Sequence, residues 1–356
     1  MDFGVCVLPK PHQCGADAKL AEECGFTHVW VSDTQMMAGD PYLCLGLIAQ
    51  QTKRVRLGTG VAVVGTRIAP VTANSIATLN QLAPGRVILG IGTGNSAWRA
   101  MGLPPRSLRA LREHVRVVRG LVRGEAVEYQ EGTEWRTIQF FHQEQGFMNT
   151  RDAVPLHLAA NAPKAMELAG EIGDGFITSR TNTVEGWQAT WAQVRHGAEQ
   201  AGRDPASLYT TLLTTACLLR PGESYASPRV KAEVGPWAMV ALHALYEKVQ
   251  NPAAAPEPIR PLFSTYKAFI DQRLQESNHY YLTLHDGHGL YLQPEEAHFV
   301  TPEVIQTTTM TSTPEALLNR LHALEEAGVK QVAFLSPPEA FSAFVREFSE
   351  KVIARF

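Results

Sequence analysis

The chain of 356 residues is long enough for one large domain or two ordinary ones, and 45% of its residues are hydrophobic while 19% are charged. These proportions are typical of a globular protein with a sizeable core. The net charge of −3 comes without a basic stripe, which argues against a nucleic-acid-binding surface, and no apolar run reaches the roughly 20 residues that cross a bilayer. The five cysteines are irregularly spaced and form no CxxC motif, which indicates reduced thiols in a cytoplasmic protein. The first residues resemble a strand rather than a charged leader with an apolar core, so we expect no signal peptide.

Short apolar segments alternate with longer segments of helical periodicity along the chain. Most of the short segments are nearly continuous apolar runs, as in strands that are covered on both faces. We predict strands over residues 3–8, 27–32, 55–62, 87–92, 155–160, 175–179, 208–219 and 331–336. The predicted helices between and after them span residues 16–24, 41–51, 70–84, 106–123, 163–172, 184–201, 314–327 and 339–353. Eight such strand–helix units predict a single domain over residues 1–356, a closed (β/α)8 TIM barrel of the α/β class.

Two segments interrupt the alternation. Residues 127–138 are typical of a β-hairpin with Gly132 in its turn. Residues 221–308, between the seventh and eighth predicted strands, are rich in proline and histidine, and we expect helices only over 236–250 and 259–275. Because a long loop inside a compact domain is usually functional, we predict that this insertion forms a lid or a substrate wall.

Small, hydroxyl and amide side chains follow the predicted strands. The active site of a (β/α)8 barrel lies at the carboxyl ends of its strands. These ends lack the paired carboxylates of a glycosidase and the Ser/His/Asp set of a hydrolase. Small residues let a planar ring lie against the backbone, and hydroxyls, amides and helix N-termini can hold a phosphate. The pattern predicts a redox cofactor that brings its own reactivity.

Three segments carry a resemblance to a known family. They are 57–61 (LGTGV), 76–86 (IATLNQLAPGR) and 89–94 (LGIGTG). With them the chain resembles the bacterial-luciferase-like flavin and deazaflavin oxidoreductases, and within these most of all the methylenetetrahydromethanopterin reductase branch. Further support comes from 155–160 and 169–175. The resemblance covers most of residues 1–220 and 310–356 and does not cover the insertion.

The resemblance implies a cofactor site at the strand ends. It implies a non-proline cis peptide after the third strand, matching Gly60–Val61, that backs the central ring of a reduced flavin or deazaflavin. It also implies a homodimer through the helices that follow the first three strands. The cofactor-binding residues expected on this basis are Gly60, Val61, Ala62, Thr93, Gly94, Asn95, Ala159, Ala160, Asn161, Thr178 and Ser179.

Two positions depart from the deazaflavin-dependent sugar and alcohol dehydrogenases. Those enzymes often carry Asp-His after the second strand and Glu after Gly-Thr-Gly, whereas this chain has Asp33-Thr34 and Asn95. Because their acid/base pair is missing, we favour a monooxygenase that uses reduced FMN and O2 on a small organic substrate, with reduced FMN supplied by a separate flavin reductase. The alternative is a coenzyme F420-dependent hydride-transfer reductase or dehydrogenase. A second alternative is a non-catalytic flavin-binding protein.

Four residues are the candidate catalytic groups: Asp33, Asn95, His285 and His288. Asp33 and Asn95 also suit helix caps, which is the competing interpretation for both. Within residues 279–288, His285 or His288 could donate a proton or contact the substrate. The same segment could instead bind a metal through His279, His285 and His288, or simply form a loop around the Asp286–Gly287 turn. We predict no metal site.

Overall fold

Eight parallel strands form the inner layer of the protein in the computed structural model, which describes residues 1–249 and 251–356. They are β1 (Asp2–Val7), β2 (His28–Val31), β3 (Arg56–Thr59), β5 (Val87–Gly92), β8 (Leu156–Ala159), β9 (Gly175–Thr178), β10 (Tyr209–Thr215) and β11 (Gln331–Leu335). Each strand pairs with the next in this order, and β1 pairs with β11. The sheet is therefore closed, and the predicted (β/α)8 TIM barrel is confirmed.

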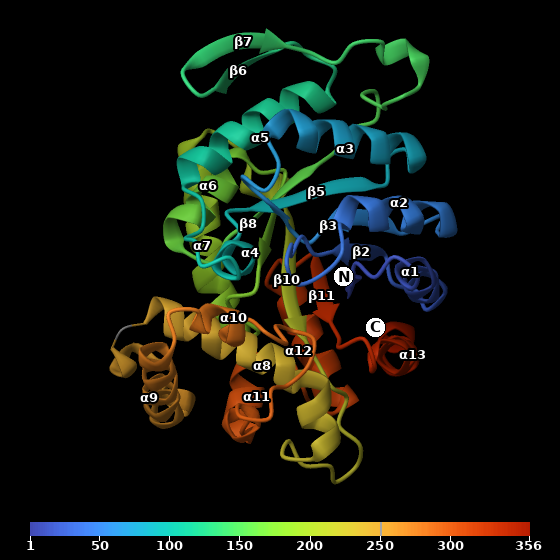
Figure 1. Ribbon diagram of the computed structural model, residues 1–356. Coiled ribbons are helices and arrows are strands. Elements are labelled where there is room, and N and C mark those ends of the chain that lie inside the picture. The colour runs from blue at the N-terminus through green and yellow to red at the C-terminus, as the bar shows by residue number, and fades with distance from the viewer. Residues whose placement is uncertain (250) are drawn as a thin grey trace.

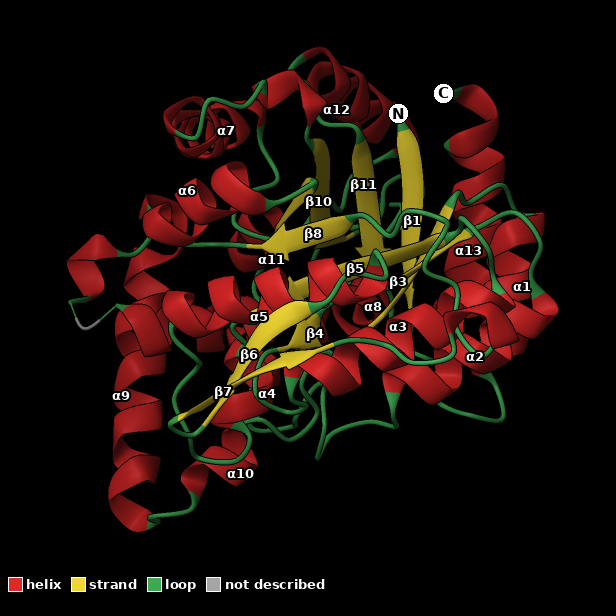
Figure 2. Ribbon diagram, turned by 90° about the horizontal axis from the view of Figure 1, so that it is seen from above, coloured by secondary structure: helices red, strands yellow, loops and turns green. Residues whose placement is uncertain are grey.

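Helices surround the strands on the outside of the barrel (Figure 2). They are α1 (Cys14–Glu23), α2 (Pro41–Gln51), α3 (Ala69–Leu82), α5 (Leu108–Val122), α6 (Pro163–Ile172), α7 (Val184–Gln200), α12 (Pro314–Glu326) and α13 (Phe341–Lys351). Several begin with a side-chain cap: Asp40 accepts hydrogen bonds from the N–H groups of Tyr42 and Leu43, and Thr183 accepts one from Gly186. Such caps satisfy N–H groups that have no partner inside the helix.

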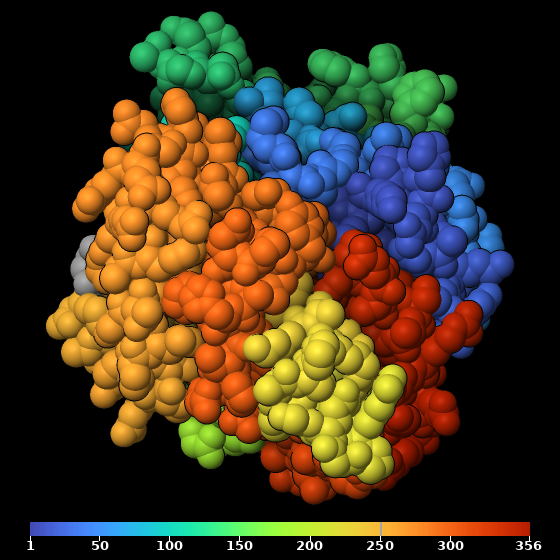
Figure 3. All heavy atoms as spheres, turned by 60° about the horizontal axis from the view of Figure 1, so that its bottom comes forward, coloured from blue at the N-terminus to red at the C-terminus, as the bar shows by residue number. Residues whose placement is uncertain are grey.

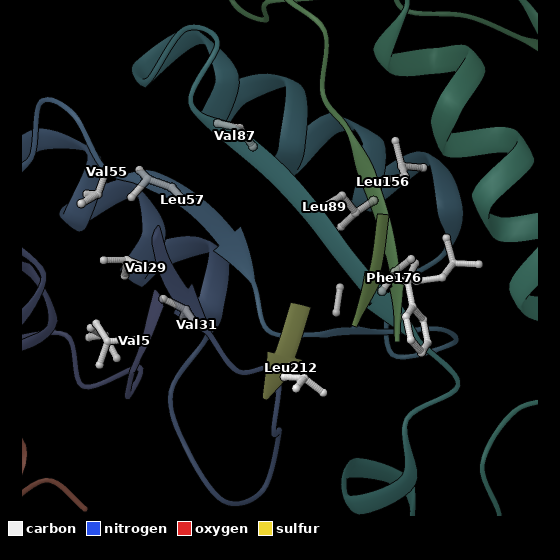
Figure 4. Packing of buried hydrophobic residues seen from close by; sticks show 14 of the residues in the cluster. Val5, Val29, Val31, Val55, Leu57, Val87, Leu89, Leu156, Phe176 and Leu212 are labelled. Carbon is white, nitrogen blue, oxygen red and sulfur yellow. The ribbon is translucent and has the colours of Figure 1, made fainter. Parts of the chain in front are cut away.

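Alternating side chains of the strands build two apolar layers. Val29 and Val31 point outward and pack with Leu57 and Leu89 under the helices, as Figure 4 shows. Trp30, between the two valines, packs with other inward-facing residues in a separate cluster that fills the barrel. Because alternate residues face these two apolar layers, both faces of each strand are covered, and its sequence is a nearly continuous apolar run.

Two predicted strands differ from the structure, and one short helix was not predicted. The strand predicted over 55–62 is interrupted after β3, and β4 (Ala62–Val63) follows the break. The strand predicted over 208–219 ends at Thr215, and a five-residue helix, α4 (Asn95–Arg99), precedes α5.

The predicted hairpin is confirmed as β6 (Val127–Glu131) and β7 (Glu134–Ile138), outside α3 and α5 (Figure 1). Short 3-10 turns span Gln143–Gln145, Pro205–Ser207, Pro252–Ala254, Glu257–Ile259, Ala297–Phe299 and Ile353–Arg355.

The insertion between β10 and β11, the seventh and eighth barrel strands, is largely helical. It contains α8 (Pro228–Lys248), α9 (Arg260–Glu276), α10 (Tyr280–Leu284) and α11 (Pro302–Thr308). It has an apolar core of its own, with the rings of Phe263, Tyr266 and Phe299 at the centre. In Figure 1 the arrowheads of β10 and β11 point toward α8, and Figure 3 shows yellow and orange insertion residues covering much of this end.

The prediction that a helix of the insertion begins at Pro236 is wrong. Helix α8 begins at Pro228, where the Ser227 side chain accepts a hydrogen bond from the N–H of Val230. Pro236 lies inside the helix on its buried face, so the loss of one backbone hydrogen bond is tolerated within the packed insertion. The predicted end of this helix, residue 250, lies outside the described residues. Helices α10 and α11 were not predicted.

Two expectations from the composition concern the cysteines and membrane-spanning segments. All five cysteines are free, as predicted for reduced thiols. None of the helices in residues 1–249 and 251–356 combines the length and the apolar character needed to cross a membrane.

Candidate active site

A cavity of about 330 Å³ opens at the carboxyl ends of the strands. Most of its walls come from the ends of β2, β3, β5, β8 and β9 and the segments that follow them, and Leu213 of β10 and Lys248 at the end of α8 line it as well. All the predicted cofactor-binding residues line it except Ala62, which is buried in β4: they are Gly60, Val61, Thr93, Gly94, Asn95, Ala159, Ala160, Asn161, Thr178 and Ser179. Asp33 lines it as well.

The floor of the cavity is the peptide between β3 and β4. The Gly60–Val61 bond is cis, as the resemblance implied. The N–H of Gly60 donates to the carbonyl of Val31 at 2.7 Å, and the N–H of Val63 donates to Asp33 Oδ2 at 3.0 Å. Both ends of the bend are therefore tied to β2 and to the residues that follow it.

Asp33 is almost fully buried, with 4% of its surface exposed. Burial raises the pKa of its carboxyl group, and the hydrogen bond from Val63 and the guanidinium of Arg67, 3.7 Å away, oppose that shift. No helix begins beside it, and its carboxylate binds the chain after the cis peptide, so the cap interpretation of Asp33 is wrong.

The glycine-rich loop after β5 needs glycine at Gly94. This residue has φ of 78°, and a Cβ atom there would lie 2.2 Å from Cγ1 of Val63. At Gly92 a Cβ would lie 3.3 Å from Cβ of Ala159. The backbone thus passes close to the opposite wall, and the loop turns directly into α4, whose first residue is Asn95. Gly94 is the N-cap, so Asn95 does not cap the helix.

Asn161 joins the ends of β8 and β9. Its Oδ1 accepts hydrogen bonds from Thr178 Oγ1 at 2.8 Å and from the N–H of Ser179 at 3.0 Å, and its Nδ2 donates to Ser179 Oγ at 3.0 Å. The guanidinium of Arg180 donates to the carbonyl of Asn161 at 3.0 Å. The polar rim of the cavity is therefore one hydrogen-bonded unit.

Glu247 of α8 was not predicted as a site residue, yet it binds the loop after β5. Asn95 Nδ2 donates to Glu247 Oε2 at 3.0 Å, Arg99 Nε donates to the same oxygen at 2.9 Å, and His285 Nε2 lies 3.4 Å from Oε1. Burial acts to raise the pKa of Glu247, but hydrogen bonds from His285 and Asn95 and the charge of Arg99 outweigh it and lower the pKa.

The histidines of the insertion do not line this cavity. His285 and His288 lie on a different hollow, beside Met36 and Met37, and His279 is exposed at the start of α10. Burial lowers the pKa of His288 to about 3, so this ring is neutral near pH 7. His285 reaches the cavity only through Glu247 and Asn95. In the described part of the chain no group of His, Cys, Asp and Glu is arranged to hold a metal ion.

A second cavity, of about 490 Å³, adjoins the first. The two share Asn161, Ser179, Leu213 and Lys248, so they lie side by side. The second is walled by Trp237 and other residues of α8, by Arg180 and by threonines of α11. Its charged side chains are the cations Arg180 and Lys248. Lys248 was also missed by the sequence analysis, because no motif marks it.

The sequence profile of the luciferase-like monooxygenase family matches residues 4–331. The chain belongs to this family. A 5,10-methylenetetrahydromethanopterin reductase of Methanolobus tindarius is 35% identical over 209 residues, which are 58% of this chain and 62% of that protein. The enzyme of that name from Archaeoglobus fulgidus is 26% identical over 341 residues, 95% of this chain and 94% of that protein.

A solved structure is similar over the whole chain. The coenzyme F420-dependent tetrahydromethanopterin reductase from Methanopyrus kandleri has a TM-score of 0.70 at 21% identity, covering 100% of this chain and 99% of that chain. At this identity the likeness shows the shared fold. The family that the sequence motifs indicated is thus confirmed. The match to the Methanolobus tindarius enzyme spans less than two thirds of that enzyme's length.

Proposed function

We propose that the protein is a coenzyme F420-dependent oxidoreductase that transfers a hydride between the deazaflavin and a small organic substrate. The observation that carries this proposal is the cavity itself, which is walled by backbone and small side chains around Gly60–Val61 and rimmed by hydroxyl and amide groups. Such a surface offers position and hydrogen bonds but few reactive groups, so the chemistry must come from the cofactor.

The residues of the two cavities fit a ring with an anionic tail. Gly92 and Ala159 leave room for a flat ring because their side chains are absent or small, and both line the cavity. The hydroxyl and amide groups of Asn161, Thr178 and Ser179 suit a polar ring edge, and the cations in the second cavity suit a phosphate. When bound, the deazaflavin supplies a hydride; the chain binds it, orients it and excludes water from it.

The choice of cofactor follows the named relatives. The sequence analysis favoured an FMN-dependent monooxygenase, in keeping with the family's name. The methylenetetrahydromethanopterin reductases support its alternative instead, because the similar Methanopyrus kandleri enzyme is described as dependent on coenzyme F420. Thr34 and Asn95 still depart from the sugar-oxidising pattern, so we do not propose a sugar as the substrate.

The insertion supports a role as substrate wall. Trp237 and Lys248 of α8 line the second cavity together with Thr307 and Thr308 of α11. Asn182, after β9, donates hydrogen bonds to the carbonyls of Thr307 and Thr309 at 3.3 and 2.8 Å, which ties the insertion to the barrel. We therefore propose that residues 221–308 enclose the substrate against the cofactor.

Parallel anaerobic titrations with reduced F420 and reduced FMN test the proposed function. We expect saturable binding of reduced F420, detected by its absorbance, and much weaker binding of reduced FMN. The variant Ala159→Phe should abolish F420 binding because the new ring fills the cavity, whereas Ala253→Phe, at an exposed position of the insertion, should not. Binding of FMN alone, with oxygen consumed afterwards, would establish the monooxygenase. Binding of F420 with no oxidation of the bound cofactor by any of a panel of carbonyl, imine and alkene compounds would favour the non-catalytic alternative.

A further inference from the structure

Few side chains around the two adjoining cavities can exchange a proton. Among the described residues that line them, the ionisable ones are Asp33, Arg180 and Lys248. A guanidinium does not release its proton in proteins. Among the ionisable side chains of the described residues, Asp33 and Lys248 are therefore the two that could donate a proton inside this space.

Asp33 is poorly suited to repeated proton transfer. Its carboxylate accepts the N–H of Val63, lies near the guanidinium of Arg67 and holds the bend after the cis peptide. It is 4% exposed, so water reaches it poorly once the cavity is filled. A proton donor must be recharged from solvent after each turnover, and Asp33 offers no open route for that.

Lys248 has the opposite surroundings. It is the last residue of α8, it lines both cavities, and it is exposed. Among the residues that the structure describes, none forms a hydrogen bond or an ion pair with its ammonium group, because the neighbouring Glu247 carboxylate faces Asn95, Arg99 and His285. Its proton is thus directed to the cavity and can be replaced through the open side.

The electrostatic surroundings of Lys248 favour release of that proton. Although much of the Lys248 side chain is exposed, the surrounding chain partly removes water from its ammonium group and so lowers the pKa. The positive charges of Arg180 and Arg99 lower the pKa further, while the carboxylate of Glu247 opposes them. A lysine with a lowered pKa is a better general acid near neutral pH than a free lysine, because proton transfer is most effective when the pKa lies near the working pH.

We propose that Lys248 is the catalytic proton donor, an inference that rests on the proposed hydride transfer. In the reducing direction, the carbon of a polarised C=O or C=N bond accepts the hydride and its heteroatom accepts the proton from Lys248 Nζ. The substrate is reduced, the deazaflavin is oxidised, and the neutral amine of Lys248 regains a proton from water. In the oxidising direction the same amine, when neutral, accepts the proton.

Competitive labelling of the lysines tests this without any substrate. The intact protein is treated with trace acetic anhydride over a range of pH, and acetylation of each lysine is measured by peptide mass spectrometry. We expect Lys248 to reach half-maximal labelling at a lower pH than the average of the other lysines, and saturating reduced F420 to protect it. The Glu247→Gln variant should move the midpoint of Lys248 lower still. Labelling of Lys248 at the average midpoint, without protection by F420, would overturn the proposal.

Variants of Lys248 separate this role from cofactor binding. At saturating reduced F420, Lys248→Met should lose roughly 10² to 10⁴-fold in hydride transfer to a carbonyl or imine substrate, although loss of this cation also weakens the binding of F420. Lys248→Arg keeps the charge but should not restore the rate. If Lys248→Met transfers hydride at the wild-type rate, Lys248 is not the donor. If the wild type itself fails to bind F420, the proposed function fails instead, and the labelling midpoint still reports on Lys248.

Discussion

Gly94 is the residue at which backbone conformation and cavity shape depend on each other most directly. Its φ of 78° is one that side chains with a Cβ rarely adopt, and the space beside it is already taken by Val63. The close approach sets the width of the cavity between the loop after β5 and the segment after β3. A side chain at this position would have to push the two segments apart.

We therefore expect Gly94→Ala to lower the free energy of unfolding by more than the left-handed conformation alone explains. The matched control is Gly202→Ala, where φ is 68° but nothing lies within 4 Å of the added Cβ. Gly202→Ala should lower the free energy of unfolding by about 1–2 kcal/mol, the usual penalty of this conformation for a residue with a Cβ. Denaturant unfolding of both variants measures the difference. Equal losses for the two would mean that Val63 moves away without cost.

At the scale of elements, Glu247 is the point where α8 is attached to α4. Its side chain is 7% exposed, and it accepts hydrogen bonds from Asn95 and from the charged Arg99. We expect Glu247→Gln to destabilise the protein by on the order of 2 kcal/mol, the usual value for charge-assisted hydrogen bonds. The control is Glu295→Gln, an exposed residue of the same insertion, which should change the unfolding free energy little.

The effect of Glu247→Gln depends on pH. The pKa of Glu247 in the folded protein is lowered by its partners, so its carboxylate stabilises the fold fully above the unfolded pKa of about 4.3. That contribution is lost as the pH falls through the folded pKa. Denaturant unfolding at pH 7 and near pH 3 should therefore show a gap between wild type and variant that shrinks in acid. A gap of constant size would mean that Glu247 acts through packing rather than through its charge.

The pattern of the sequence was informative wherever local rules decide structure. Eight apolar segments that alternate with helical segments were enough to predict the barrel. Thr93, Ala159 and Ser179 meet in one cavity because parallel strands end at the same edge. The strand over 55–62 was predicted as continuous, because apolar periodicity does not register a cis peptide at Gly60–Val61.

These local rules do not predict contacts between side chains that are far apart in the sequence. Asn95 and Glu247 are separated by 152 residues, and they meet only because the insertion folds back over the barrel. Pro236 was predicted as a helix start, since proline favours the first turn, but it is a buried residue in the middle of α8. The helix predicted over 236–250 included Glu247 and Lys248, but its periodicity alone did not show that Glu247 bonds to Asn95 or that Lys248 lines the cavity. One signal was available: Glu247 and Lys248 are two charged residues at the end of a predicted helix in an insertion expected to cover the barrel.

At the scale of the whole molecule, α2 and α3 form an unusual surface. Neither helix contains a charged residue, although both lie on the outside of the barrel. They lie side by side, since a Cβ at Gly46 of α2 would be 3.8 Å from Leu82 of α3. Large aliphatic side chains are exposed on them: Leu43 (60%), Leu47 (38%), Ile68 (50%), Val71 (46%) and Leu82 (45%). Exposed aliphatic side chains gathered on two neighbouring helices without charged residues often mark an interface.

We propose that this surface pairs with the same surface of a second copy. An uncharged partner surface suits it best, since a charged one would lose its hydration against the apolar side chains. The two helices themselves provide an uncharged surface, and a two-fold axis between copies would place each on its equivalent. Light scattering coupled to gel filtration should give twice the chain mass. The double variant Leu43→Glu/Val71→Glu should give the monomer mass with unchanged circular dichroism, because four charges, two from each copy, would be buried together. Leu274→Glu, at a position on α9 that is 42% exposed, should leave the dimer intact. A wild type that elutes as a monomer at micromolar concentration would exclude this interface.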